Sequence, residues 1–247
     1  MEAPASDGRR QVYGRRAVRL RAGQRERLET LLPRLRVGLP EAGGRLDPAR
    51  LFPSSLDDLW LEVGFGGGEH LAGVARDHPG VGILGVEPFV GGVAKLLRSL
   101  EAEGSGNVRI VVDDARLVLD ALPDFCLGRA YVLFPDPWPK LRQQKRRIVN
   151  PRTAAAFARL LRPGAELRLA TDDPDYGRFM LETLLAEPRF DWRAEGAPDW
   201  RLPWPGWHRT RYQEKAEAAG RPPLFLRFTR RQAPASRRKE TLAGRVG

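Results

Sequence analysis

LWLEVGFGGGEHLAGVARDH, residues 59–78, is the stretch that decides the fold. Its first part, 59–63, is apolar apart from Glu62, which is typical of a strand buried within a sheet. The glycines of GFGGG (64–68) allow a tight turn and let a ligand approach the backbone closely. The segment 69–78 then has the spacing of a helix. A strand, a glycine loop and a helix in this order predict the first unit of a parallel α/β sheet.

Strands and helices continue to alternate along the chain. The expected strands are 59–63, 81–87, 107–115, 130–134 and 165–172, with short β segments at 190–194 and 224–230. The expected helices are 23–35, 69–78, 88–104 beginning at Pro88, 115–123, 150–164 closed by Pro163 and Gly164, and 175–187. This order predicts an α/β fold with a doubly wound, mostly parallel seven-stranded sheet and helices on both faces, the Rossmann-like arrangement.

The charge of the chain favours nucleic acid as a partner. The 247 residues include 42 Lys and Arg against 31 Asp and Glu, for a formal net charge of +11, and only five of the cations are lysines. Arginine suits phosphate because its planar fork donates two parallel hydrogen bonds. A strongly basic protein of this length fits one α/β domain that binds nucleic acid. The alternative is an arginine-rich proteome in which the charge has no functional meaning.

Several classes of protein are excluded by what the sequence lacks. Cys126 is the single cysteine, so neither an internal disulfide nor a cysteine metal cluster can form. His70, His78 and His208 lack metal-ligand spacing, so no metal is expected. No apolar run approaches the roughly 20 residues of a membrane span, and the N-terminus lacks the apolar core of a secretory signal. A cytoplasmic protein without a membrane partner, either a monomer or a homodimer, is therefore expected.

The residues around the glycine loop indicate the chemistry of the cofactor. A dinucleotide fingerprint has glycine at its sixth position, where this chain has Glu69. A carboxylate at that position, with Glu62 before the loop, would repel a diphosphate. A cofactor that has no phosphate and carries positive charge fits better. S-adenosylmethionine, with a sulfonium and an ammonium on an adenosine, has these properties.

Acidic residues end the next two strands as well. Glu87 ends the second strand, where a carboxylate can accept hydrogen bonds from both ribose hydroxyls. Asp114 ends the third strand, where it could accept from the adenine amine or cap the following helix. Since carboxyl ends of parallel strands meet at one edge of a sheet, we expect these acids to share a cleft.

LFPDPWPK (133–140) ends the fourth strand at the same edge. Prolines cannot extend a sheet ladder, so the strand must stop there. Asp136 and Trp138 are therefore expected at the edge of the cleft. Trp138 either stacks on a base or packs the loop.

Together these motifs resemble the bacterial tRNA (guanine-N7)-methyltransferases. The motifs shared in order are LEVGFGGGEH, GVEPF, LFPDPWPKLRQQKRRIVN, LRLATDDPDY and RTRYQEKA, and YGRRAVRLRAGQ near the N-terminus is also similar. The likeness covers about residues 10 to 230, and the closely spaced FPDPW and KRR elements are its most specific part. It implies a class I methyltransferase fold and methyl transfer from S-adenosylmethionine to N7 of the guanine at position 46 in the tRNA variable loop.

The resemblance also implies roles for individual residues. The cofactor-binding set is Glu62, Glu87, Asp114 and Asp136, to which the glycine loop adds Gly64 and Gly66. Asp136 is in addition the implied catalytic residue. The substrate-binding set is Lys140, Asp172, Thr210, Arg211, Tyr212 and Gln213. The RNA-binding set is Arg142, Lys145, Arg146 and Arg147.

One position departs from the family pattern. The family usually has glutamate where this chain has Gln213. Either Glu214 supplies that carboxylate, or the contact is made by the amide of Gln213.

The chemistry of guanine N7 agrees with the absence of a nucleophile set. N7 has an in-plane lone pair and needs no general base, and we find no Ser/His/Asp arrangement. The reaction needs N7, the methyl group and sulfur in line, together with a fixed negative charge. Asp136 could supply that charge and could also accept hydrogen bonds from guanine N1 and N2.

The distribution of charge and of expected elements divides the chain into three parts. We expect a basic N-terminal arm with a short helix at 1–35, a methyltransferase domain at 36–232, and a disordered basic tail at 233–247.

Two basic segments are open to two interpretations each. The run at 140–147 either contacts phosphate, in which case replacing Arg146 and Arg147 by alanine lowers the salt dependence of tRNA binding, or it is a solvated face. The segment 198–215 either closes over the substrate as a flap or packs on the core through its tryptophans, which are Trp200, Trp204 and Trp207.

Other functions remain possible from the sequence. The FPDPW element is similar to the Asp-Pro-Pro-aromatic motif of exocyclic-amine methyltransferases, although its second proline is displaced beyond the tryptophan. A non-enzymatic tRNA-binding module with a vestigial cofactor fold is the second alternative, and a nicotinamide enzyme is a distant third.

Overall fold

The computed structural model describes residues 20–41, 43–54, 56–104 and 106–232. The predicted tail at 233–247 and the part of the predicted arm before residue 20 lie outside this range.

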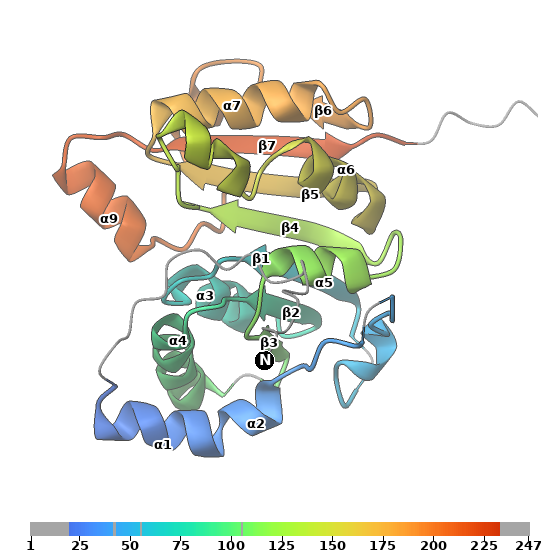
Figure 1. Ribbon diagram of the computed structural model, residues 1–247, viewed down its shortest axis with the longest axis vertical. Helices are drawn as coiled ribbons and strands as arrows, with labels where there is room; N and C mark the ends of the chain where they lie inside the picture. Colours follow the sequence, from blue (N-terminus) through green and yellow to red (C-terminus); the bar gives the residue numbers. More distant parts are fainter. Residues whose placement is uncertain (1–19, 42, 55, 105, 233–247) are drawn as a thin grey trace, which may run out of the picture.

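Seven strands form a single sheet in the order β3-β2-β1-β4-β5-β7-β6 (Figure 1). Their bounds are β1 Asp58–Val63, β2 Val81–Val86, β3 Val108–Val111, β4 Leu127–Leu133, β5 Leu161–Thr171, β6 Phe190–Trp192 and β7 Leu224–Arg230. The first five strands pair in parallel, and β7 runs antiparallel to β5 and to β6. The predicted mostly parallel seven-stranded fold is confirmed. The strand order reverses between β1 and β4, and ligands bind at such a switch point.

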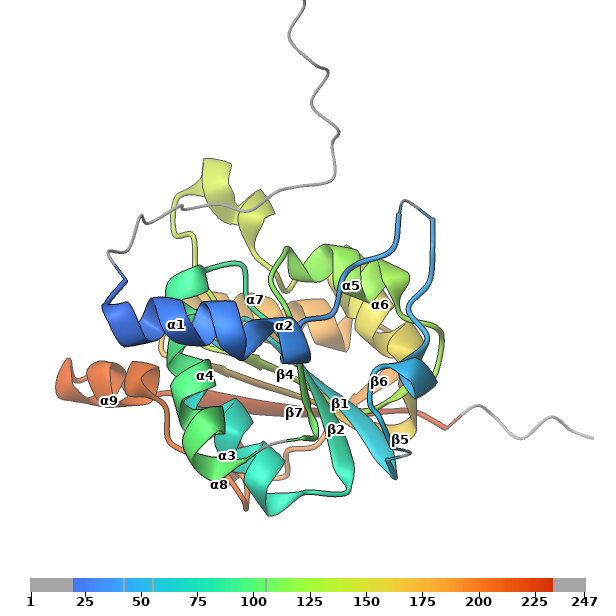
Figure 2. The same ribbon diagram turned by 90° about the horizontal axis from the view of Figure 1, so that it is seen from below.

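Helices cover both faces of the sheet, as Figure 2 shows. The helices α5 Ala115–Ala121, α6 Pro151–Leu160 and α7 Pro174–Leu185 pack on one face, and α3 Glu69–Asp77 and α4 Val90–Glu103 pack on the other. Side chains alternate across a strand, so β1 contributes Leu61 and Val63 to one apolar core and Trp60 to the other. The carboxyl end of β1, which leads into the glycine loop, is thereby fixed from both sides.

The described part of the predicted N-terminal arm packs against the domain. It forms α1 Ala22–Thr30 and α2 Leu32–Leu35, and α1 packs across α4 (Figures 1 and 2). Arg27 Nε donates to Glu101 Oε2 at 2.6 Å, and Leu35 is buried in the core. This segment therefore belongs to the body that carries the cleft.

Several elements differ from the sequence prediction. The helix predicted to end at Pro163 and Gly164 ends at Leu160, because Leu161 already pairs with Leu127 of β4. The helix predicted from Pro88 begins at Val90, with Phe89 at its N-cap. Two short 3₁₀ helices, η1 Pro48–Arg50 and η2 Leu141–Arg146, and two α-helices, α8 Pro198–Arg201 and α9 Arg211–Ala218, lie in segments where no helix was predicted.

Two negative findings apply to the part of the chain that the structure describes. Within the described ranges, the helices are too short or too polar to cross a lipid bilayer. Within the same ranges, no cluster of three or more His, Cys, Asp or Glu side chains is arranged to hold a metal ion.

Candidate active site

A cleft of about 790 Å³ opens at the carboxyl ends of β1, β2, β3 and β4. Its wall contains the glycine loop after β1 and one acidic residue after each of the other three strands, namely Glu87, Asp114 and Asp136. Arg211 and Tyr212 close one side of it from α9, which lies at the same end of the sheet (Figure 1). The cleft therefore brings together every predicted cofactor-binding residue except Glu62.

The glycine loop adopts backbone conformations that require glycine. Gly64 and Gly66 have φ angles of 70° and 57°, in the left-handed region. A Cβ on Gly66 would lie 2.8 Å from a ring carbon of Tyr212. The loop therefore has no room for a side chain at Gly66, where α9 packs against it.

Glu87 connects the glycine loop to the start of α4. Its Oε2 accepts a hydrogen bond from the backbone N–H of Gly66 at 2.9 Å, and its Oε1 accepts from that of Phe89 at 3.0 Å. Burial raises the pKa of Glu87 to about 7, although these two bonds lower it, and the charge of Asp136 raises it further. The negative charge of this residue therefore depends on pH in the neutral range.

Gly92 is a site residue that the sequence interpretation missed. It lies in α4 and lines the cleft, and a Cβ at this position would lie 2.2 Å from the carbonyl oxygen of Gly66. Adjacent glycines inside a predicted helix, Gly91 and Gly92, were the available signal, since glycine weakens a helix unless close packing requires it. Other cleft residues not predicted are Phe89, Lys95, Arg116 and Ile148.

We expect Gly92→Ala to destabilise the protein by about 1–3 kcal/mol, because α4 must move away from the glycine loop. Helix propensity alone would favour alanine, so a loss of stability identifies the steric contact. Thermal unfolding of the protein measures the effect. Gly38→Ala is the matched control, since a Cβ there meets nothing within 4 Å. Equal melting temperatures for the two variants would contradict the prediction.

Asp114 caps a helix at the cleft wall, which is one of the two roles that the sequence left as alternatives. It is the N-cap of α5, where Oδ1 accepts from the backbone N–H of Arg116 at 2.9 Å. Its Oδ2 accepts a hydrogen bond from Arg116 Nη1 at 3.2 Å. A carboxylate has about four acceptor sites, so Asp114 keeps acceptor capacity while it caps the helix.

The FPDPW loop is strained where it leaves β4. Phe134 and Trp138 have φ angles of 49° and 44°, which are uncommon for residues other than glycine. Asp136 lies between them and is exposed at the cleft. The guanidinium of Arg146 lies 4.9 Å from the ring of Trp138, and both side chains line the cleft. Trp138 is therefore part of the cleft wall.

Glu62 lies outside the cleft, unlike the sequence prediction. It is 3% exposed, and its Oε2 lies 2.7 Å from Nδ1 of His70 on α3. Side-chain alternation along β1 turns Glu62 to the same face as Trp60, toward α3. The structure gives Glu62 a contact that joins β1 to the first turn of α3.

The predicted substrate residues at 210–213 divide into two pairs. Arg211 and Tyr212 line the cleft, and Arg211 Nε donates to Glu69 Oε1 at 2.6 Å. Thr210 caps α9, and its Oγ1 accepts from the backbone N–H of Gln213 at 3.2 Å. Thr210 and Gln213 therefore position the pair that reaches the cleft.

The amide of Gln213 makes two hydrogen bonds within the protein. Its Oε1 accepts from Trp207 Nε1 at 2.7 Å, and its Nε2 donates to Glu217 at 2.8 Å. Glu214 is exposed and lies 4.0 Å from Arg209. Glu214 therefore does not occupy the place of Gln213 in this structure.

The tryptophans of the segment 198–215 pack on the core. Trp204 is buried, with its ring edge-to-face against Trp207 and Phe225 at 5.0 and 5.8 Å. Trp200 lies 5.6 Å from Trp192. These tryptophans therefore pack on the core, and within the segment 198–215 the cleft is lined by residues of α9.

Two other predicted substrate residues lie away from the cleft wall. Lys140 is exposed at the start of η2. Asp172 follows β5, and its Oδ2 accepts from Arg221 Nε at 2.9 Å.

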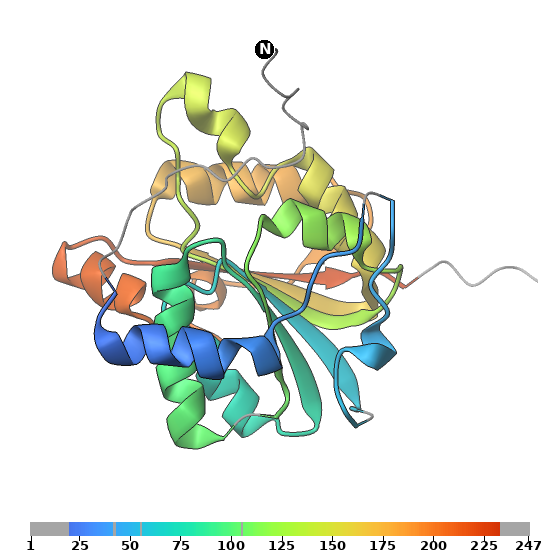
Figure 3. The ribbon, with the colours of Figure 1, turned by 60° about the horizontal axis from the view of Figure 1, so that its bottom comes forward.

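The predicted RNA-binding residues face three different directions. Figure 3 shows their segment, coloured yellow-green, projecting from the body. Residues three apart lie above one another in a 3₁₀ helix, and Arg142 and Lys145 are both exposed. Arg146 lines the cleft, whereas Arg147 is buried. The side chain of Arg147 is therefore enclosed by the protein, unlike those of Arg142 and Lys145.

A family model and curated relatives match most of this chain. The model described as "Putative methyltransferase" matches residues 57–225. A tRNA (guanine-N(7)-)-methyltransferase of Rhodospirillum rubrum is 50% identical over 238 residues, which cover 95% of this chain and 92% of that relative. One of Azorhizobium caulinodans is 45% identical over 219 residues, which cover 88% and 94%.

Solved structures are similar in fold. The 16S rRNA methyltransferase KamB aligns with a TM-score of 0.56 at 19% identity, covering 78% of this chain and 98% of that one. The antibiotic-resistance methyltransferase Kmr aligns with a TM-score of 0.50 at 20% identity, covering 80% and 99%. At these identities the likeness concerns the fold alone.

Proposed function

The chain belongs to the tRNA (guanine-N(7)-)-methyltransferase family, and from this premise we propose that its cleft binds S-adenosylmethionine and the guanine that receives the methyl group. The protein is an enzyme that methylates N7 of guanine in tRNA. The observation that supports the proposed use of the cleft is the convergence of Glu87, Asp114 and Asp136 from three strand ends. We also propose that the methylated guanine is the one at position 46 of the variable loop.

The acids of the cleft fit a cationic cofactor. Each carboxylate oxygen of Glu87 accepts one backbone hydrogen bond and keeps a second acceptor site, so the residue can accept both ribose hydroxyls. Asp114 can accept from the adenine amine. Gly64 and Gly66 both line the cleft, and the space beside Gly64, where a Cβ would meet nothing within 4 Å, is open to the methionine part of the cofactor.

Asp136 is the proposed catalytic residue. Methyl transfer moves positive charge from sulfur to the purine, and a fixed carboxylate stabilises that charge. Its oxygens also match the N1 and N2 donors of guanine, which adenine does not offer. Trp138, held beside Arg146, is the proposed stacking partner of a base.

The product of the reaction tests the proposal. The protein is incubated with radiolabelled S-adenosylmethionine and an unmodified tRNA transcript, and the labelled nucleoside is identified and mapped. We expect 7-methylguanosine at position 46. Labelled methyladenosine would favour an exocyclic-amine methyltransferase, and absence of S-adenosylmethionine binding by calorimetry would favour a tRNA-binding module.

The exposed cations of η2 are the proposed phosphate contacts. Arg142 and Lys145 are exposed on the projecting segment beside the cleft. Each phosphate contact contributes about 0.9 to the slope of log affinity against log salt. We expect the Arg142→Ala, Lys145→Ala double variant to lower that slope by about 1.8, measured by filter binding to tRNA.

Arg152→Ala is the matched control for this experiment. Arg152 is also exposed, but it lies on α6 and pairs with Asp120 at 2.8 Å. Its replacement is expected to leave the slope unchanged. A double variant with the slope of the unmodified protein would mean that the η2 cations face solvent in the complex.

The location and assembly of the protein are also proposals. A tRNA substrate agrees with a cytoplasmic location, and the expected assembly is a monomer or a homodimer.

A further inference from the structure

The loop that carries Asp136 has few backbone donors with which to hold its shape. Pro135, Pro137 and Pro139 have no N–H to donate. Phe134 and Trp138 both have left-handed φ angles, which cost of order 1–3 kcal/mol each. Such strain persists only where the surrounding structure fixes the backbone. An external contact must therefore hold this loop.

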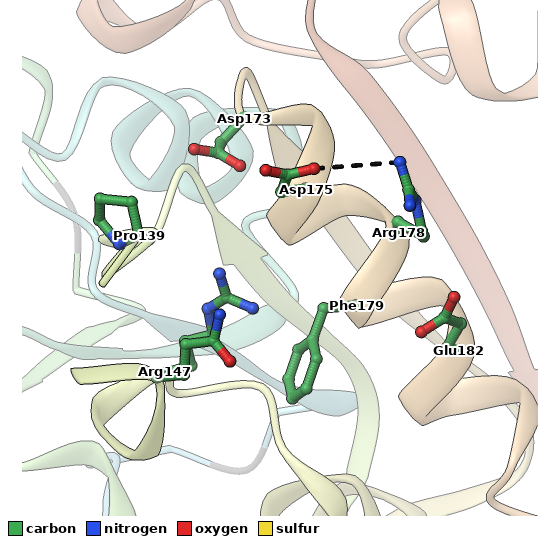
Figure 4. A pocket seen from close by; sticks show the side chains of 8 residues that line it. Pro139, Arg147, Asp173, Asp175, Arg178, Phe179 and Glu182 are labelled. Carbon is green, nitrogen blue, oxygen red and sulfur yellow. Dashed lines mark ion pairs between the residues drawn. The ribbon is translucent and has the colours of Figure 1, made fainter. Parts of the chain in front are cut away.

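Arg147 makes one such contact. Its Nε donates to the carbonyl oxygen of Pro137 at 2.8 Å, and the side chain is only 3% exposed. The guanidinium lies over the rings of Tyr176 and Phe179, at 4.7 and 4.9 Å. Figure 4 shows Arg147 beside Phe179 of α7. Pro137 directly follows Asp136, so the bonded carbonyl lies at the next residue in the chain.

The backbone of Arg147 is fixed as well. Its carbonyl accepts from Asn150 Nδ2 at 2.9 Å, and its N–H donates to the carbonyl of Gln144 at 2.9 Å. Two residues later, the backbone N–H of Val149 donates to the hydroxyl of the fully buried Tyr176 at 3.1 Å. The contact to the loop is therefore anchored in the first turn of α6 and in α7.

The surroundings of Arg147 do not suit an RNA phosphate. A second pocket, of about 240 Å³, lies against its guanidinium and contains the carboxylates of Asp173, Asp175 and Glu182 (Figure 4). Arg178, also in its wall, lies 3.9 Å from Asp175. The wall of this pocket therefore holds three carboxylates and two guanidinium groups, and this net negative charge disfavours binding of a phosphate.

We propose that Arg147 is a positioning residue for methyl transfer, which fixes Asp136 in the cleft by holding the carbonyl of Pro137. The inference rests on the proposed function, because it assumes that Asp136 acts in the reaction. It assigns to Arg147 a role in turnover in place of the RNA contact expected from the sequence.

Replacing Arg147 tests the inference. Arg147→Met keeps an apolar stem against the two rings but removes the donor to Pro137. Because a 1 Å displacement of a reacting group can cost about 100-fold, we expect kcat to fall at least about tenfold. The KM for tRNA and the salt slope of tRNA binding are expected to stay unchanged. Arg147→Lys, which can still donate to the carbonyl, is expected to retain an intermediate kcat.

The control variant is Phe179→Leu, which removes one ring beneath the guanidinium and leaves the Pro137 bond possible. Its kcat is expected to stay within about threefold of the unmodified protein. Circular dichroism melting verifies that each variant is folded. If Arg147→Met does not fold, the kcat and KM of Arg147→Lys decide the question.

Two results would overturn the inference. An unchanged kcat in a folded Arg147 variant would mean that the Pro137 bond does not position Asp136. A raised KM with a lower salt slope and normal kcat would mean that Arg147 contacts RNA. Failure of the unmodified protein to methylate tRNA would instead remove the proposed function, so the two failures are distinguishable.

Discussion

Asp136→Asn is expected to lower kcat for tRNA methylation by about 10²–10³-fold, while the protein stays folded and still binds tRNA. Loss of one preorganised electrostatic contact to a transition state has an effect of this size. Asparagine has nearly the same shape but no charge, and its amide nitrogen would donate where guanine N1 and N2 also donate. Single-turnover methylation with radiolabelled cofactor measures the chemical step.

The matched control is Asp175→Asn, which removes an exposed charge on α7 in the second pocket. Its methylation rate is expected to equal that of the unmodified protein. Because the charge of Asp136 raises the pKa of Glu87, Asp136→Asn should also lower that pKa. Near-normal turnover by Asp136→Asn would remove Asp136 from its proposed role.

Glu87→Gln is expected to weaken S-adenosylmethionine binding by about 10- to 100-fold, measured by calorimetry at pH 8. A hydrogen bond to a charged group contributes about 1.5–3 kcal/mol, and the amide replaces one charged acceptor with a donor. Glu214→Gln, which changes an exposed acid of α9, is the control and should leave the affinity unchanged.

The pH dependence of binding gives a second measurement on the same residue. The pKa of Glu87 in the empty cleft is about 7, so below this pH the side chain is largely protonated and neutral. A positively charged cofactor favours the carboxylate, so the affinity should rise with pH up to about 7 and then level off. Glu87→Gln should lose this dependence. A dependence that persists in the variant would mean that another group titrates.

The raised pKa of Glu87 also predicts how the stability of the folded protein changes with pH. The pKa of Glu87 is raised from 4.5 in the unfolded chain to about 7 in the fold, so the folded protein binds the proton more tightly. This contribution to stability is fully present below about pH 4.5 and is lost as the pH rises through about 7. The difference, about 2.5 pKa units, is on the order of 3 kcal/mol. On raising the pH from 5 to 8, the unmodified protein should lose stability relative to Glu87→Gln.

The sequence predicts the strand-end part of the site well for a physical reason. Parallel strands end at one edge of the sheet, so an acid after each apolar run, as at Glu87 and Asp114, must lie at that edge. The prolines after β4 place Asp136 there in the same way. The fold class follows from the same alternation of strands and helices.

The direction in which each side chain points could not be predicted from the sequence. Glu62 stands directly before the glycine loop, but the pleat of β1 turns it toward His70. The close approach of Gly92 to Gly66 depends on how α4 packs against the loop, which no local pattern records. The end of α6 was also predicted wrongly, because pairing between Leu161 and Leu127 replaces a turn that proline and glycine suggest.

The three-residue repeat of η2 makes the length of this segment more important than its composition. A deletion of one residue between Leu141 and Arg146 would rotate the following side chains by about a third of a turn. Arg147, which directly follows η2, would then point to water, and a cation that is now exposed would take its place over the rings of Tyr176 and Phe179. Substitution of Gln143 or Gln144 by another residue is compatible with this geometry, whereas an insertion or deletion in the segment is not.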